Sequence, residues 1–209
     1  MTKLCQHRDA LLDRVAAHLV DRPYEHLCFS RIAEECDVSL WALRYNFGNA
    51  DRLFRAMASH LIDKVVAQAP VAPPKGPASV MEALLRHARA LAGLMESEDY
   101  RRLAYFVLRN GGHHSWLETA YEERMTAKLC ADIEEAVLCA GERRGETILM
   151  RSGAAHSLFK SLETSIVLAR LLPARGVVGP DEREDIVIRA TRQAFASTYI
   201  FDWAVSSAA

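Results

Sequence analysis

Apolar residues recur at every third or fourth position along most of the chain. Between residues 11 and 20 they form one stripe, made of Leu11, Leu12, Val15, Ala16, Leu19 and Val20. A second stripe repeats at every fourth residue and consists of Leu53, Met57, Leu61 and Val65. Both spacings match the period of an α-helix. The same period predicts further helices over roughly 79–97, 99–109, 115–141, 147–172 and 181–205.

The seven prolines all fall where this helical pattern stops. Four of them lie within Ala69–Ser79, and Pro173 and Pro180 bracket a second loop. Proline lacks a backbone N–H, so neither stretch continues a helix. No alternating run of β-branched residues bounded by turn residues is present, and we therefore expect no strand. The pattern predicts an all-α fold, in which a small N-terminal unit of three helices precedes a larger C-terminal helical bundle.

Residues 28–54 are the most informative stretch, because they predict two short helices joined by a tight turn. The inward face of the first helix carries Phe29, Ile32, Ala33 and Cys36. Asp37 and Val38 form the turn. Ser39 is a good N-cap for the second helix, since its hydroxyl accepts a hydrogen bond from a free backbone N–H.

The second of these helices has two opposite faces. Leu43 and Phe47 share one face and are expected to anchor the helix in the core. At about 100° per residue, Trp41 and Tyr45 lie nearly opposite that anchor, with Arg44 beside them. A helix-turn-helix presents its second helix to the DNA major groove in this way. The alternative is that Trp41 and Tyr45 are buried against another helix. The residues expected to contact DNA are Ser39, Leu40, Trp41, Ala42, Arg44, Tyr45 and Asn46.

The segment from Asp9 to Phe54 resembles the N-terminal domain of TetR-family transcriptional regulators. The matching features are the stripe at 11–20, Ile32-Ala33-Glu34, Val38-Ser39, Leu43-Arg44-Tyr45-Asn46-Phe47-Gly48 and Asp51-Arg52-Leu53. The resemblance implies a two-domain homodimer that binds double-stranded DNA at a palindromic operator. It also implies a ligand-responsive repressor, released when a small-molecule effector binds in the C-terminal bundle. The domains are expected at 1–48 for DNA binding and at 49–209 for ligand binding and dimerisation.

Three positions depart from the family pattern. Asp37 stands where glycine is usual in the turn, although an Asx residue tolerates the left-handed conformation. Asn46 replaces a common histidine and can still donate to a phosphate. Ala50 stands where a phosphate-binding lysine is frequent. The loss of that lysine lowers affinity and salt dependence but does not remove base reading.

Charge and composition narrow the function further. The net charge is −1, and the first 60 residues hold eight Lys and Arg against eight Asp and Glu. Phosphate neutralisation drives non-specific DNA binding, so a neutral unit counts against strong non-specific affinity. A second hypothesis therefore stays open, in which a protein of this fold binds ligands or partners and has weak or lost operator recognition.

The sequence predicts a cytoplasmic protein. It has no apolar stretch of about 18 residues and no N-terminal apolar segment like that of a signal peptide. Its five cysteines include no CxxC motif, which favours thiols in a reducing compartment.

Residues 79–172 are rich in aromatic and methionine side chains, and helix bundles bind small ligands between their helices. The candidate ligand-binding residues are Met95, Tyr105, Phe106, Trp116, Tyr121 and Phe159. The alternative for each is a place in the core.

Two stripes on the last long segments predict the dimer interface. They contain Leu158, Leu162, Ile166, Ala190, Ala194 and Thr198. Two antiparallel helices from each subunit can pair across a twofold axis as a four-helix bundle. The alternative is that these stripes complete the core of one subunit.

The sequence contains no GxSxG, HExxH, GxGxxG or Walker-type motif, so we expect neither an enzyme nor a cofactor. His113 and His114 could share a metal with Glu118, but exposed loop histidines are the expectation. His156 is expected to be a hydrogen-bonded packing residue.

Overall fold

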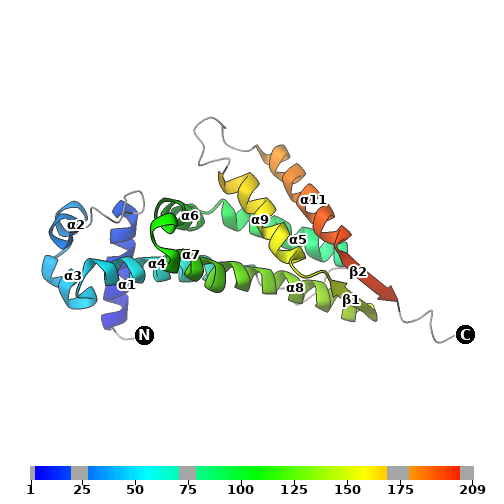
Figure 1. Cartoon of the computed structure of the whole chain (residues 1–209), viewed down its shortest axis with the longest axis horizontal. Coiled ribbons are helices and arrows are strands. Elements are labelled where there is room, and N and C mark those ends of the chain that lie inside the picture. The colour runs from blue at the N-terminus through cyan, green and yellow to red at the C-terminus, as the bar shows by residue number, and fades with distance from the viewer. Residues whose placement is uncertain (1–2, 20–27, 71–78, 169–178, 203–209) are drawn as a thin grey trace, which may run out of the picture. The chain divides into compact units, whose positions relative to one another are not determined.

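Figure 1 shows the computed structural model, which describes residues 3–19, 28–70, 79–168 and 179–202. The chain forms two compact units. The first comprises Met1–Ala67 and Glu98–Arg124, and the second comprises Gln68–Ser97 and Met125–Ala209. These units do not coincide with the domains expected at 1–48 and 49–209, because helices beyond residue 48 pack with the N-terminal helices.

The described secondary structure of the first unit consists of helices joined by turns. Its elements are α1 (Lys3–Leu19), α2 (Phe29–Glu35), α3 (Leu40–Phe47), α4 (Ala50–Ala67), α6 (Glu98–Asn110), the 3₁₀ turn η2 (Gly111–His113) and α7 (Ser115–Tyr121). The π-helical turn η3 (Glu122–Thr126) then carries the chain out of this unit.

Helix α4 is the centre of the first unit, because it contacts α1, α3, α6 and α7. Its buried face consists of Leu53, Phe54, Met57, Ala58, Leu61, Ile62 and Val65. From α1, the predicted stripe contributes the buried residues Leu11, Leu12, Val15 and Ala16. Both predicted stripes are therefore confirmed over these residues. The side chains of Leu19 and Val20 lie outside the described part of the chain.

In the described residues of the second unit, four helices pack around one core. Its elements are α5 (Val80–Met95), α8 (Ala127–Glu142), β1 (Glu146–Met150), α9 (Ala154–Glu163), the π-helical turn η4 (Thr164–Leu168), α11 (Pro180–Ala196) and β2 (Thr198–Asp202). Helix α5 contacts α8, α9 and α11. Arg89 of α5 donates to Glu184 of α11 at 2.6 Å, which adds an ion pair along the seam between these helices.

Two short strands correct the expectation that the chain contains none. Strands β1 and β2 pair antiparallel, in a register that runs from Glu146 opposite Asp202 to Met150 opposite Thr198. The helices predicted over 147–172 and 181–205 are therefore wrong at these residues. Helix α11 ends at Ala196, and the Thr198 hydroxyl donates to the carbonyl of Ala194 at 3.1 Å.

Strand β1 is held against α8 by a close approach. A Cβ atom added to Gly141 of α8 would lie 2.2 Å from Cγ1 of Ile148 in β1. Strand β1 depends on pairing with β2 and on packing against Gly141. Both are tertiary contacts, so the local spacing of apolar residues does not predict them. The all-α class is nonetheless correct, since helices form almost all of the described structure. The two predicted proline-rich loops lie mostly outside the described residues.

Candidate nucleic-acid interface

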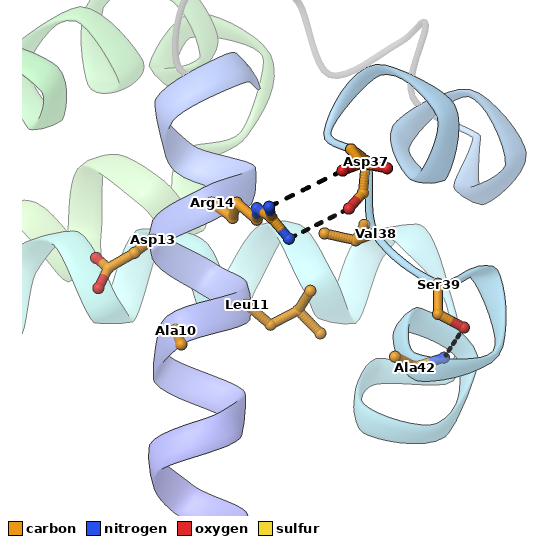
Figure 2. A pocket seen from close by; sticks show the side chains of 8 residues that line it. All are labelled: Ala10, Leu11, Asp13, Arg14, Asp37, Val38, Ser39 and Ala42. Atoms are coloured by element: carbon orange, nitrogen blue, oxygen red, sulfur yellow. Dashed lines mark hydrogen bonds and ion pairs between the residues drawn. The ribbon is translucent and has the colours of Figure 1, made fainter.

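The turn between α2 and α3 has the conformation that Asp37 was expected to tolerate. Asp37 has a φ of 49°, and within the described chain it is the only non-glycine residue with positive φ. The backbone N–H of Val38 donates to the carbonyl of Ala33 at 3.0 Å and closes the turn. From α1, the Arg14 guanidinium donates to the Asp37 carbonyl at 3.3 Å (Figure 2). This contact ties the turn to the first helix.

Helix α3 begins and is anchored as the sequence predicts. Ser39 accepts from the N–H of Ala42 on its hydroxyl, with 3.4 Å between the two atoms (Figure 2). Leu43 and Phe47 are buried, at 0% and 4% exposure. Gly48 ends the helix at φ 72°, a conformation that favours glycine. The N-cap at Ser39, the buried side chains of Leu43 and Phe47, and the helix end at Gly48 together determine which face of α3 is exposed.

Trp41 and Tyr45 form the outward face of α3, as predicted. Their exposures are 70% and 64%, so the alternative that they are buried is wrong within this chain. The two rings stack on each other, with centroids 5.0 Å apart and planes 13° from parallel. Arg44 is also exposed. An indole, a phenol and a guanidinium are thus available together for an external partner.

The other candidate DNA-contacting residues, apart from Ser39, are less exposed than Trp41, Arg44 and Tyr45. Leu40 and Ala42 are half-buried, whereas Ser39 is exposed. Asn46 is half-buried, and its amide nitrogen donates to the carbonyl of Ala42 at 2.8 Å. The amide nitrogen has a second N–H, which can still donate to a phosphate while this helix contact is kept.

Two arginines near α3 are held by carboxylates. Arg31 donates to Glu35 at 2.8 Å, and this hydrogen bond raises the pKa of Arg31. Arg55 donates to Asp51 at 3.0 Å. Among the described residues, Arg44 and Arg52 have no ion-pair partner. These pairings reduce the positive potential that the unit can offer to a polyanion.

Arg52 is a candidate that the sequence reasoning missed. It is exposed on the first turn of α4, and its Nη1 lies 3.8 Å from the position that a Cβ on Gly48 would take. Its cation therefore lies beside the end of α3, two residues after Ala50. The sequence contained a signal for this residue. A phosphate-binding lysine is frequent in the family at the position of Ala50, so a cation is expected in this turn.

An open pocket of about 740 Å³ lies between α1, the turn and α3 (Figure 2). Its lining residues are Ala10, Leu11, Asp13, Arg14, Asp37, Val38, Ser39 and Ala42. Only Ser39 and Ala42 among these were expected at a DNA interface. Four of the others belong to α1, and Asp37 and Val38 belong to the turn.

The six candidate ligand-binding residues are divided between the two units. Met95 and Phe159 are buried in the second unit, whereas the other four belong to the first. Within the first unit Phe106 packs on Phe54, Trp116 lies under Arg55, and Tyr121 shares a hydrogen bond with Tyr100. Tyr105 is 42% exposed. These positions favour core roles for Phe106 and Tyr121, while the ligand-binding role of the set stays a prediction.

Most candidate dimer residues are buried inside one subunit. Leu158, Leu162, Ile166, Ala190 and Ala194 are all at most 2% exposed, and Thr198 is half-buried at the start of β2. Helices α9 and α11, which carry four of these residues, pack on each other and on α5. The burial fits the alternative that the stripes complete the core of one subunit. Dimerisation itself stays a prediction.

Several remaining predictions concern single side chains. His156 is exposed on α9, so the expectation of a packed histidine is wrong. His113 is exposed as expected, whereas His114 is half-buried with its ring beside those of Phe54 and Trp116, so the expectation is wrong for His114. No group of three His, Cys, Asp or Glu side chains in the described residues is arranged to hold a metal. Among the cysteines whose side chains the structure describes, Cys28, Cys36, Cys130 and Cys139, no disulfide is formed. None of the described helices has the length and apolar character needed to cross a membrane.

The fold is that of TetR-family transcriptional regulators. A Mesorhizobium loti protein assigned to that family superposes with a TM-score of 0.71 at 17% identity, over 95% of this chain and 99% of its own. A TetR-family regulator from Pseudomonas syringae gives a TM-score of 0.69 at 19% identity, over 95% of this chain and 98% of its own. One from Agrobacterium tumefaciens gives 0.63 at 18% identity, over 90% and 92%. No protein-family model and no curated protein matches the sequence.

Proposed function

We propose that this protein is a cytoplasmic transcriptional repressor that binds a palindromic operator in double-stranded DNA as a homodimer. The observation that carries the proposal is the outward face of α3, where Trp41, Arg44 and Tyr45 are exposed opposite a buried anchor. The fold supports it, because α3 is the second helix of a helix-turn-helix and such a helix enters the major groove. The interface consists of Ser39, Leu40, Trp41, Ala42, Arg44, Tyr45 and Asn46.

Arg44 is the residue we assign to base reading. Its guanidinium has no ion-pair partner among the described residues, and a guanidinium can bond both acceptors of a guanine edge at once. The replacement Arg44→Ala then weakens binding to the operator by roughly 5- to 150-fold, which corresponds to about 1–3 kcal/mol. Arg101→Ala is the matched control, because Arg101 is an exposed arginine on α6 that also lacks an ion pair in the described structure.

The test is a selection of bound sequences from a random pool of DNA duplexes with the full-length protein. A palindromic motif should emerge, with half-sites about 34–36 Å apart or a multiple of that distance. Affinities for the selected duplex and a scrambled one are then compared at several salt concentrations. Equal affinity for both duplexes contradicts the proposal.

The effector is proposed to bind in the C-terminal bundle of the second unit. Two buried polar atoms support this site, because Nε2 of His87 and Oγ1 of Thr126 have no hydrogen-bond partner within the described structure. Buried polar groups are normally paired, so a bound molecule with hydrogen-bonding groups would satisfy them. Met95 and Phe159 are buried in the same unit and belong to the proposed ligand-binding set.

His87→Leu tests the effector site. A compound that raises the melting temperature and weakens operator binding of the natural protein should do neither with this variant. Thr126→Val serves as the second probe, and His156→Leu serves as the control at an exposed position on α9. A full response of the His87 variant would place the effector elsewhere.

The ion pairs of Arg14, Arg31 and Arg55 with acidic side chains favour a second candidate function. In this alternative the protein binds ligands or partners and no longer recognises an operator. Absence of sequence preference in both the natural protein and an Ala50→Lys variant would support it. Specific binding that strengthens on adding the lysine would support the repressor.

A further inference from the structure

The stacked pair of Trp41 and Tyr45 is an exposed apolar surface that the fold does not use. Both residues lie on α3, four positions apart, and each is more than three-fifths exposed. Their rings are nearly parallel, 13° apart, with centroids 5.0 Å from each other. The two side chains therefore present one continuous aromatic surface.

The stack also restricts the indole. A free tryptophan side chain on a helix surface exchanges rotamers, and holding it in one of them on binding costs free energy. Stacking against Tyr45 favours one placement before any partner arrives, since aromatic pairs of this kind attract each other. Tyr45 is thus a positioning residue for Trp41. The stacked pair is therefore suited to contact a small apolar group whose position relative to α3 is fixed.

The major groove offers one such target. Base edges there present hydrogen-bonding groups, and the only apolar group among them is the C5-methyl of thymine. If α3 enters the groove, the stacked rings meet base edges on the same face as Arg44. The face of an aromatic ring cannot distinguish the hydrogen-bond donors and acceptors of a base edge. It can, however, bury a methyl group.

We infer that the Trp41–Tyr45 stack recognises the C5-methyl group of one thymine in each operator half-site. This inference rests on the proposed DNA-binding function and names the base that the site reads. Arg44 lies three residues beyond Trp41, or about 4.5 Å along the helix axis. That rise is close to the spacing of about 3.4 Å between bases of one strand. The thymine is therefore within one or two steps of the guanine that Arg44 contacts.

The test uses the duplex selected from the random pool. Each thymine is replaced in turn by deoxyuridine, which removes the methyl group and leaves every hydrogen-bonding group in place. At one thymine per half-site the dissociation constant should rise about fourfold, as expected for one buried methyl group. Replacing that base by 5-bromodeoxyuridine, whose bromine has nearly the size of a methyl group, should restore binding to within about twofold.

Protein variants assign the effect to the stack. Trp41→Ala should bind more weakly and no longer distinguish thymine from deoxyuridine at that position. Tyr45→Phe keeps the stack and should keep the discrimination, whereas Tyr45→Ala should reduce it. Arg44→Ala is the matched control on the same helix, because it should lose the guanine preference and retain the methyl preference. Circular dichroism verifies that each variant is folded.

The possible failures are distinguishable. If no sequence preference emerges from the pool, the proposed function fails and this inference fails with it. If specific binding is found but no thymine responds to loss of its methyl, or if Trp41→Ala still discriminates, the inference is overturned while the repressor stands. DNA unwinding on binding, measured with closed circular DNA, would show that the rings intercalate, which also overturns it.

Discussion

The carboxylate of Asp13 on α1 lies 2.8 Å from the ammonium nitrogen of Lys64 on α4. The same oxygen lies 2.8 Å from Nε2 of His60, one turn earlier on α4. Lys64 also approaches Asp99 at the start of α6, at 3.6 Å. One carboxylate therefore joins the first helix to the helix at the centre of the first unit.

Asp13→Asn should destabilise the protein slightly at neutral pH. Partial burial alone would raise the pKa of Asp13, but hydrogen bonds from His60 and Lys64 outweigh it and lower that pKa. The contribution to stability is below about 1 kcal/mol, since the Asp13 and Lys64 side chains are 48% and 35% exposed. The melting temperature should fall by at most about 2–4 °C, measured by circular dichroism.

The pH dependence of this variant follows from the direction of the shift. A carboxyl whose pKa is lowered by folding stabilises the folded state above its ordinary pKa, about 3.9, and this contribution is lost as the pH falls through the lower folded value. The two proteins should therefore differ at pH 7 and converge at strongly acidic pH. Asp9→Asn on the same helix is the control. A constant difference at all pH values would show that the substitution acts through packing.

His87→Leu should leave stability near neutrality almost unchanged. The imidazole is 4% exposed, and Nε2 has no hydrogen-bond partner among the described residues, so removing it removes a desolvated polar atom. Burial lowers the pKa of His87, although the charge of Asp132 opposes this. The expected change in the free energy of unfolding at pH 7.5, measured in urea, is within about 1 kcal/mol.

The same variant should resist mild acid better than the natural protein. Below the ordinary histidine pKa, about 6.5, the unfolded chain binds a proton that folded His87 does not, so stability falls as the pH decreases towards the folded value. The free-energy difference between variant and natural protein should therefore grow in favour of the variant between pH 6.5 and 5. His156→Leu removes an exposed histidine and should show no such growth.

Gly141→Ala should destabilise the second unit. The added methyl would lie 2.2 Å from Cγ1 of Ile148, and overpacking of this kind costs about 1–3 kcal/mol. Gly93→Ala is a matched control on α5, because nothing lies within 4 Å of its added Cβ. That control should stabilise the helix by up to about 1 kcal/mol. Chemical denaturation of both variants measures the contrast.

A double variant identifies the cause. Ile148→Ala removes the side-chain atoms that the new methyl would meet, so adding it to Gly141→Ala should cost less than the sum of the single changes. Strict additivity would mean that the glycine is needed for another reason.

The parts of the fold that the sequence predicted depend on neighbours in the chain. The cap at Ser39 and the anchor formed by Leu43 and Phe47 follow from helix geometry, and the outward faces of Trp41 and Tyr45 follow from that anchor. Each of these features needs only the identity of residues within about two helical turns. This is why the candidate interface could be located from the amino-acid sequence alone.

The features of the fold that the sequence did not predict depend on residues far apart in the chain. An apolar stripe such as that of Leu158 and Leu162 shows that a face is buried but not which helix buries it, so core and dimer interface could not be separated. Strand β1 exists because Ile148 packs against Gly141 and β2 pairs beside it.

Adding a cation at the start of α4 should strengthen DNA binding by the proposed repressor. Ala50 is the first residue of α4 and half-buried, so a lysine there can extend its ammonium group to solvent. One additional phosphate contact should steepen the dependence of affinity on salt by about one unit of slope. Arg52→Ala should lower the slope by about one, since Arg52 is exposed beside the end of α3. Titrations of the selected duplex at several salt concentrations measure both slopes.

The control variant adds a lysine at the other end of α4, where no contact with DNA is expected. Ala67→Lys adds a lysine at the exposed last residue of α4 and should leave the slope unchanged. A phosphate contact acts on every sequence, so the changes from Ala50→Lys and Arg52→Ala should be equal for operator and scrambled duplexes. If Arg52→Ala weakened operator binding alone, Arg52 would read a base. If neither variant changed the slope, the start of α4 would lie away from the DNA backbone, and α3 would enter the groove without support from this turn.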